Sequence, residues 1–287
     1  MKKRNLSFWY FVGPILFAYI VIQLIPLLVG IYYSFTNWNG INSSVKLIGL
    51  KNYISVFKDP GFGHAFLFTA KFTILALIIL NVIAFGLALL VTRESKISNM
   101  LRTIFFMPNL IGGLILGFIW QFIFTQVFAS IGKLLGIQWL QGWLSDGKTG
   151  LYGLVILTAW QMSGYLMIIY VASLQNIPPE LVEAAQIDGA NAWQRIKNII
   201  IPLVRPAFTV SIFLTLSNSF KLYDQNLSLT AGGPSNSTEM LAMNIYNTAF
   251  SLNQMGLAQA KAVIFLLIVG AISLIQVYFS KKGEVEA

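Results

Sequence analysis

The sequence predicts an all-α membrane protein with six transmembrane helices and both termini in the cytoplasm. Of its 287 residues, 56% are hydrophobic and 10% are charged, whereas soluble domains are about 45–50% apolar and about 25% charged. Long uncharged runs recur along the chain, and all five arginines fall in the connections on one side of the expected bilayer. This pattern excludes disorder and disfavours a soluble globular fold.

Six uncharged runs locate the expected helices. A spanning helix needs about 20 mostly apolar residues, and only the fifth run, 206–220, falls clearly short unless it continues past Lys221. The first run follows three basic residues, but it is too long for a signal peptide and has no small-residue cleavage site, so we expect a retained anchor. The whole chain, 1–287, is therefore expected to be one transmembrane domain, with spans at roughly 8–34, 66–92, 103–125, 151–174, 203–223 and 257–280.

Basic residues orient these helices. If the N-terminus is inside, the inside segments hold 11 lysines and arginines in 56 residues, and the outside segments hold 8 in 104. Cytoplasmic loops carry such an excess of positive charge. The inside segments are then 1–7, 93–102, 175–206 and 281–287. On the outside, we expect a short surface helix within 238–250.

The connection 175–202 is the longest inside segment and the most polar part of the chain. Pro178 and Pro179 end the fourth span and suit the start of a short helix. Gly189 provides a left-handed stop, and Asn191 with Gln194 has the spacing of a capping box for a second helix. A cytoplasmic helix-turn-helix fits these signals, and an ordinary connecting loop fits them equally well on local pattern alone.

The same connection resembles a known signature. It contains Glu-Ala-Ala at 183–185, Asp-Gly-Ala at 188–190 and Ile-Ile-Ile-Pro at 199–202. This series is similar to the EAA signature of permease subunits of binding-protein-dependent ABC importers. One departure is Ile196, where the family usually carries Phe; both are large and apolar, so we expect little consequence.

A second resemblance narrows the branch. Leu-Thr-Ala-Gly-Gly-Pro at 229–234, followed by Thr238, resembles the outer-loop LTxGGP stretch of the maltose-permease-like, carbohydrate-uptake branch. The likeness includes Phe-Thr-Asn-Trp at 35–38 and the order of spans, so it covers nearly the whole chain. It implies the type I ABC importer permease fold.

In that family, the short helix around the Glu-Ala-Ala turn docks in a groove of a cytoplasmic ATPase. Small alanines allow close approach, a glutamate suits a charge-assisted hydrogen bond with a basic partner, and Asp-Gly turns the chain back. The resemblance therefore implies a mechanical joint that performs no chemistry itself. Its residues would be Glu183, Ala184, Ala185, Asp188, Gly189 and Ala190.

One motif points elsewhere. Residues 142–149, from Gly142 to Lys148 and Thr149, match G-x-x-x-x-G-K-[ST], the phosphate-binding P-loop. That motif works between a strand and a helix of a parallel sheet, and no such sheet is expected here. The orientation also puts this segment outside the cell, away from ATP. We interpret it as an outer loop.

Polar side chains inside spans are costly in lipid and tend to face a bundle interior or a wet cavity. Two helical faces carry them at helical spacing, and a break near the start of the third span adds an amide. Hydrogen bonding between helices and lining of a sugar pathway explain these faces equally well. The candidate pathway residues are Asn109, Thr158, Gln161, Tyr165, Thr215, Asn218 and Ser219.

These observations predict the permease subunit of an ATP-driven importer for a sugar, with an oligosaccharide as the expected substrate, in the bacterial plasma membrane. The resemblance implies a homologous second permease, two ATPase subunits and an extracellular sugar-binding protein as partners. This chain itself would bind no cofactor, because ATP and Mg would sit on the ATPases. It would not be an enzyme, since it has no cysteine and only one histidine, His64, and no metal site is expected.

Two alternatives stay open. One is an ABC permease for another solute, such as glycerol phosphate. The other is a secondary transporter, which would need ion-coupling carboxylates in its spans. The only acidic residue near a span interior is Asp224, at an outer end, which disfavours that alternative.

Overall fold

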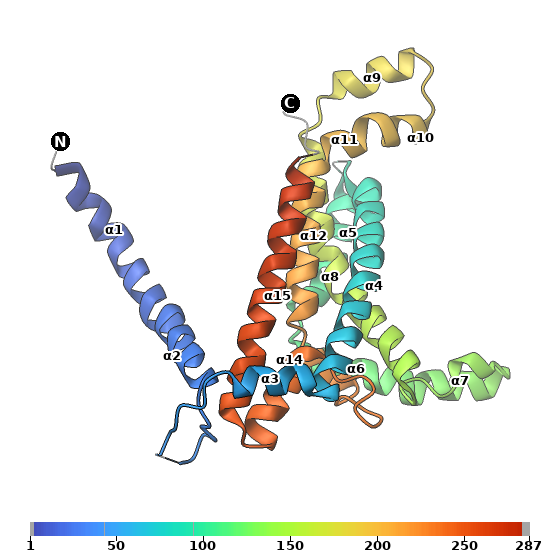
Figure 1. Cartoon of the computed structure of the whole chain (residues 1–287). Coiled ribbons are helices and arrows are strands. Elements are labelled where there is room, and N and C mark those ends of the chain that lie inside the picture. The colour runs from blue at the N-terminus through green and yellow to red at the C-terminus, as the bar shows by residue number, and fades with distance from the viewer. Residues whose placement is uncertain (1–2, 43, 94, 283–287) are drawn as a thin grey trace. The chain divides into compact units, whose positions relative to one another are not determined.

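The computed structural model describes residues 3–42, 44–93 and 95–282 (Figure 1). Within these ranges the chain is built of helices and their connections, with one antiparallel bridge between Thr36 and Leu47. The α-helices are α1 (Lys3–Tyr19), α2 (Ile25–Ser34), α3 (Lys51–Lys58), α4 (Pro60–Val91), α5 (Lys96–Phe106), α6 (Gly113–Phe122), α7 (Phe128–Leu135), α8 (Gly147–Gln175), α9 (Pro179–Ile187), α10 (Ala192–Arg195), α11 (Ile201–Leu203), α12 (Arg205–Phe220), α13 (Asp224–Leu229), α14 (Leu241–Tyr246) and α15 (Met255–Lys281).

Short helical turns join several of these helices into longer ones. The π-helical turns are η1 (Ile20–Leu24), η3 (Ile123–Val127), η5 (Ile196–Ile200) and η6 (Asn247–Ser251), and the 3-10 turns are η2 (Met107–Leu110) and η4 (Gln138–Leu140). The helix expected within 238–250 is confirmed as α14 with η6. The expected cytoplasmic ends, 1–2 and 283–287, lie outside the described residues.

Five helical segments in the described chain are long and apolar enough to cross a membrane, and a sixth arises if one bent pair counts as a single span. This agrees with the six predicted spans in number. The segments are Trp9–Ser34, Pro60–Val91, Gly113–Leu135, Gly147–Gln175 and Met255–Lys281, and the bent pair is Ala192–Leu203 with Arg205–Phe220.

The placement of the third predicted span, 103–125, is wrong. α5 ends at Phe106, the turn η2 follows, and the long apolar helix begins only at Gly113. Pro108 has no N–H to extend an α-helical ladder, and Gly112 enters α6 with a ψ of 141°. The break itself lies where the proline and the glycines predict it.

The fifth predicted span, 203–223, is only partly a straight helix. α12 has 16 residues, and it is bent by 71° from the helical segment that ends at Leu203. Pro206 lies at the start of α12, where its missing N–H is tolerated and the preceding ladder cannot continue through it. This bend separates the predicted inside connection from the bundle.

Two compact units make up the structure, the first being Met1–Gly63 with Asn244–Leu267. Here α1, η1 and α2 form one helical run whose most apolar part has no buried residue. In a membrane protein such side chains face lipid or another protein. The end of α2 is capped by Asn52, whose amide donates to the carbonyl oxygens of Ser34 and Thr36 at 2.8 Å each.

A buried ammonium lies in the first unit. Lys261, on α15, is 3% exposed, and its Nζ lies 2.8 Å from Asp59 Oδ2, Asn244 Oδ1 and Thr248 Oγ1 alike. The ring of Phe62 lies 5.8 Å below it. Three acceptors match the three protons of the ammonium. A charge inside the last candidate span is thus fully paired.

The second unit, His64–Met243 with Ile268–Ala287, is organised around α8. Apolar residues are spread around this whole helix, a pattern typical of a buried helix, and Leu154, Leu157 and Leu166 are completely buried. A Cβ at Gly164 would overlap the carbonyl oxygen of Phe105. Glycine therefore permits the close approach of α5 to α8.

Candidate functional site

The predicted helix-turn-helix is present as a hairpin of residues 178–203. α9 begins after Pro178 and ends at Ile187, and the left-handed residue Gly189, with a φ of +81°, follows its C-cap. The N–H of Ala190 donates to the carbonyl of Ala185 at 2.9 Å, and that of Gly189 to the carbonyl of Gln186 at 3.1 Å. This pair of bonds is a Schellman motif, so local chemistry alone sets the turn.

The second arm starts with the predicted capping box. The N–H of Gln194 donates to Asn191 Oδ1 at 2.9 Å, and the N–H of Asn191 donates to Gln194 Oε1 at 2.8 Å. Arg195 also donates to the carbonyl of Ala190 at 2.8 Å. Both arms are therefore fixed at the turn, and helix α10 with η5 and α11 leads back to α12.

The hairpin projects beyond the ends of α8 and α12 (Figure 1). Of the predicted joint residues, Ala185 and Ala190 are half-buried, and the rest are exposed: Glu183, Ala184, Asp188 and Gly189. Three exposed apolar side chains beside them were not predicted from the sequence. Leu181 is 46%, Trp193 67% and Ile187 86% exposed. Where such side chains gather in a contiguous exposed patch, they mark a contact with another protein or a membrane.

Three of the predicted pathway residues come together in a small polar pocket of about 260 Å³. Asn109 comes from η2, Gln161 from α8 and Asn218 from the end of α12. Gln161 is held in place, because its Nε2 donates to the carbonyl of Ile111 at 3.2 Å and its Oε1 accepts from Gln225 Nε2 at 2.8 Å. The pocket offers amide donors and acceptors from three elements.

The pocket also contains residues that the sequence analysis did not select. Lys221, Leu222 and Gln225 line it, together with Met162. Lys221 and Gln225 follow the helix end, so helical spacing could not group them with Gln161. A search of the residues just beyond each span for polar side chains would have found them.

The other four predicted pathway residues do not line this pocket. The hydroxyl of Thr158 donates to the carbonyl of Leu154 at 2.8 Å, and that of Thr215 to the carbonyl of Ser211 at 2.8 Å. Tyr165 is half-buried against the apolar core, and Ser219 is buried. Their part in a pathway stays a prediction.

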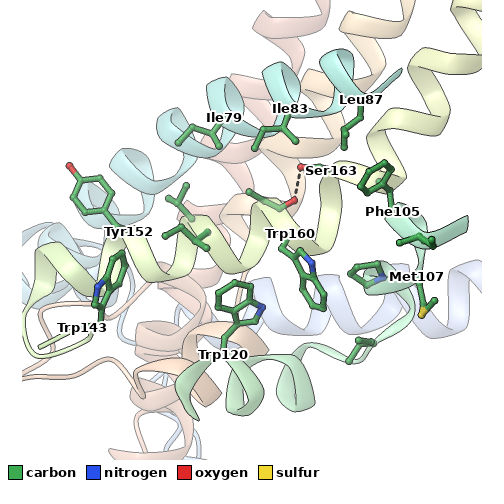
Figure 2. A pocket seen from close by; sticks show the side chains of 17 residues that line it. Ile79, Ile83, Leu87, Phe105, Met107, Trp120, Trp143, Tyr152, Trp160 and Ser163 are labelled. Atoms are coloured by element: carbon green, nitrogen blue, oxygen red, sulfur yellow. Dashed lines mark hydrogen bonds between the residues drawn. The ribbon is translucent and has the colours of Figure 1, made fainter. Parts of the chain in front are cut away.

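A larger groove of about 900 Å³ opens between α4, α5, α6 and α8 (Figure 2). Ile79, Ile83 and Leu87 line one side, and Trp120 and Trp160 line the other. The hydroxyl of Ser163 in the groove donates to the carbonyl of Ala159 on its own helix. Sugar hydroxyls need hydrogen-bonding partners, which this apolar lining scarcely offers. The smaller pocket therefore offers hydrogen-bonding partners that the groove largely lacks.

The LTxGGP stretch folds around a completely buried side chain, Asn226. Its amide donates to the carbonyl of Thr238 at 2.8 Å and to Thr230 Oγ1 at 3.1 Å, and its oxygen accepts from the N–H of Met240 at 3.0 Å. The hydroxyl of Thr238 in turn donates to the carbonyl of Gly233 at 2.8 Å. The motif residues thus specify one ordered loop.

The apparent P-loop has no phosphate-binding geometry. Asp146 caps α8 and accepts the N–H groups of Lys148 and Thr149 at 2.8 and 2.7 Å. These hydrogen bonds, first of all the one from Thr149, hold the pKa of the Asp146 carboxyl below its usual value of 3.8. The amides that would bind a phosphate are therefore occupied by a carboxylate.

Comparison with known proteins gives these features a family context. Residues 81–284 match the family model described as binding-protein-dependent transport system inner membrane component. The chain is 56% identical over 284 residues to a probable starch degradation products transport system permease protein, AmyD, of Thermoanaerobacterium thermosulfurigenes, covering 99% of this chain and 97% of that protein. It is 32% identical over 278 residues to the multiple sugar-binding transport system permease protein MsmF of Streptococcus mutans, covering 96% of each.

The fold also matches a solved structure. A chain in the crystal structure of a bacterial alginate ABC transporter, in complex with alginate pentasaccharide-bound periplasmic protein, superimposes with a TM-score of 0.83. The match covers 98% of this chain and 96% of that chain at 19% sequence identity. The shared feature is the fold.

Proposed function

Because this chain belongs to the family of binding-protein-dependent transport system inner membrane components, we propose that it forms half of the translocation pathway of an ATP-driven sugar importer. The family predicted from the EAA and LTxGGP stretches is confirmed. The observation that carries the proposal is the 178–203 hairpin, which presents Leu181, Ile187 and Trp193 in exposed positions beyond the helical bundle.

A cytoplasmic ATPase is the partner of this hairpin. The exposed apolar side chains can be buried in a groove of the ATPase, and the carboxylate of Glu183 can pair with a basic residue of that partner. ATP and Mg bind to the ATPase, so this chain holds neither and hydrolyses nothing. It lies in the bacterial plasma membrane with both termini in the cytoplasm, which puts the hairpin on the ATPase side.

Sugar is the substrate class that the site chemistry supports. The relatives AmyD and MsmF carry sugar transport in their names. The polar pocket presents side-chain amides from Asn109, Gln161 and Asn218, and amides serve as both donors and acceptors for hydroxyl groups. At about 260 Å³ it is smaller than most ligand sites, which fits one half of a pathway shared with a second permease.

Transport then proceeds by alternating access, in which the pathway opens in turn to the outside and to the cytoplasm. ATP binding closes two ATPases and draws the docked hairpins together, and the loaded sugar-binding protein stabilises the same outward-facing state from outside. ATP and the loaded sugar-binding protein therefore each strengthen the binding of the other. Hydrolysis then resets the inward-facing state.

Uptake by the purified complex in proteoliposomes tests this function. We expect labelled maltooligosaccharide to enter only with ATP and the binding protein present. Gln161→Ala and Asn218→Ala should lower uptake about tenfold each, since one or two hydrogen bonds to the sugar are lost, while Ser163→Ala serves as the control on the same helix. ATP-independent uptake driven by an ion gradient, or uptake of glycerol phosphate in place of sugar, would contradict the proposal.

A further inference from the structure

A buried polar cluster joins three helices of the second unit. Asn81 on α4 accepts hydrogen bonds at its Oδ1 from Tyr170 Oη on α8 and from Ser211 Oγ on α12, both at 2.7 Å. Its Nδ2 donates to the carbonyl of Leu77 at 2.7 Å and lies 3.5 Å from Thr215 Oγ1. Tyr170, Ser211 and Thr215 are completely buried, and Asn81 is 7% exposed.

The cluster leaves Asn81 no spare hydrogen-bonding capacity. Its oxygen has two acceptor sites and its nitrogen two protons, and the four contacts above use all of them. If α8 slides against α12 at this level, a buried hydroxyl loses its partner where no water replaces it. The three helices are therefore held together at the level of Asn81.

An aromatic layer joins the same three helices next to the cluster. Phe85 on α4, Tyr170 on α8 and Phe208 on α12 lie with ring centroids 4.8–5.5 Å apart. Phe85 follows Asn81 by one helical turn, and Phe208 precedes Ser211 by about one turn. Two adjacent layers, one polar and one aromatic, thus fix α4, α8 and α12 to one another.

The position of these layers is informative. Along α8, Tyr170 lies about one and a half turns from Gln175, where the helix leads into the hairpin. Along α12, Ser211 lies about two turns from Arg205, where the chain returns from it. In the opposite directions, Gln161 of the polar pocket lies about two and a half turns from Tyr170, and Asn218 lies about two turns from Ser211.

We propose that Asn81 is a positioning residue that makes α8 and α12 move as one body, so that displacement of the hairpin reaches the polar pocket. This inference rests on the proposed function, because it assigns a path between the ATPase joint and the sugar site. Without the Asn81 bonds, the two helices would respond to the hairpin separately. ATP hydrolysis would then continue without the corresponding movement of the helices that line the polar pocket.

The test is the number of sugars imported per ATP hydrolysed by the reconstituted complex. A variant that only folds or assembles less well lowers uptake and hydrolysis in proportion and leaves this ratio unchanged. Asn81→Leu keeps the size of the side chain and removes its polar atoms. Thr73→Val is the matched control, because Thr73 is buried on the same helix and its hydroxyl donates only within that helix, to the carbonyl of Thr69.

We expect Asn81→Leu to lower the ratio about tenfold, from the hydroxyls left without a partner, and Thr73→Val to leave it unchanged. Tyr170→Phe should lower it less in the wild-type background and have no further effect together with Asn81→Leu. If the Asn81→Leu variant does not assemble, the ratio measured for Tyr170→Phe alone tests the inference. A wild-type ratio in the assembled variants, or equal effects of Tyr170→Phe in both backgrounds, would overturn the inference.

Failure of the proposed function gives a different result. In that case the wild-type complex itself shows no ATP-dependent sugar uptake. A wild-type complex that couples hydrolysis to uptake, with variants that do so equally well, contradicts the role of Asn81 alone.

Discussion

Gly189 shows how one residue shapes the hairpin. Its φ of +81° lies in the region that residues with a Cβ rarely adopt, and apart from its two chain neighbours, a Cβ built there meets no atom of the described residues within 4 Å. Any intramolecular penalty of a larger side chain therefore comes from the backbone conformation, not from crowding. That separates it from Gly164, where the close approach of α5 is the constraint.

We predict that Gly189→Val weakens the ATPase joint about tenfold, because the left-handed conformation costs a β-branched residue roughly 1–2 kcal/mol. Gly189→Asn is the control, since asparagine tolerates this conformation well. The measurement is the amount of ATPase that co-purifies with each variant. Equal co-purification of the Val and Asn variants would show that the turn conformation is not required for docking.

Single residues were predictable where their chemistry is local. Gly189 and Asn191 were identified because stop and cap signals depend on neighbours in the sequence. Thr215 was selected for its polarity, but its hydroxyl donates to a carbonyl of its own helix and accepts a hydrogen bond from the amide of Asn81 on α4. Asn81 is likewise polar and inside a predicted span, but its partners, 89 and 130 residues away, could not be identified from the sequence.

Among the elements, the buried charge pair between Lys261 of α15 and Asp59 makes the stability of the fold depend on pH. Burial acts to raise the pKa of the Asp59 carboxyl, but the hydrogen bond and charge of Lys261 and the N–H groups of Gly61 and Phe62 outweigh it and hold the pKa below its usual value of 3.8. With a lowered folded pKa, the stabilisation is complete above the unfolded pKa and is lost as the pH falls through the folded one.

We predict that Asp59→Asn destabilises the protein by about 3 kcal/mol, because it leaves the buried ammonium of Lys261 without a counter-charge. The double variant with Lys261→Met should recover most of this loss. Thermal unfolding in detergent measures both, and acidification below pH 4 should destabilise the wild type more than the double variant. A double variant as unstable as the sum of the two single variants would contradict the pairing.

Elements were predictable where a breaker or cap marks their ends. The hairpin and the break after Phe106 were both located from prolines and glycines. The third span was misplaced because the charge gap 103–132 gives the length of an apolar run and not where a helix begins within it. Lys261 was included in a predicted span without a partner, since Asp59 lies 202 positions earlier in the sequence.

For the whole molecule, the account requires that the hairpin lie on the cytoplasmic side and contact the ATPase. The six spans and the arginine pattern predict that side, and the exposed apolar residues of the hairpin predict the contact. The chain contains no cysteine, so any introduced thiol is unique. Ile187, 86% exposed on the hairpin, and Ile41, 76% exposed in a segment predicted to be outside, form a matched pair of sites.

The most direct test attaches a thiol-reactive photo-cross-linker to Ile187→Cys in the assembled complex and then illuminates it. A cytoplasmic hairpin docked on the ATPase gives a covalent product of this chain with the ATPase, and its Cys is protected from an impermeant reagent added to intact cells. Ile41→Cys should give the opposite pattern, labelling from outside and no ATPase product. Labelling of the Ile187→Cys protein from outside, with no product containing the ATPase, would contradict both the orientation and the joint.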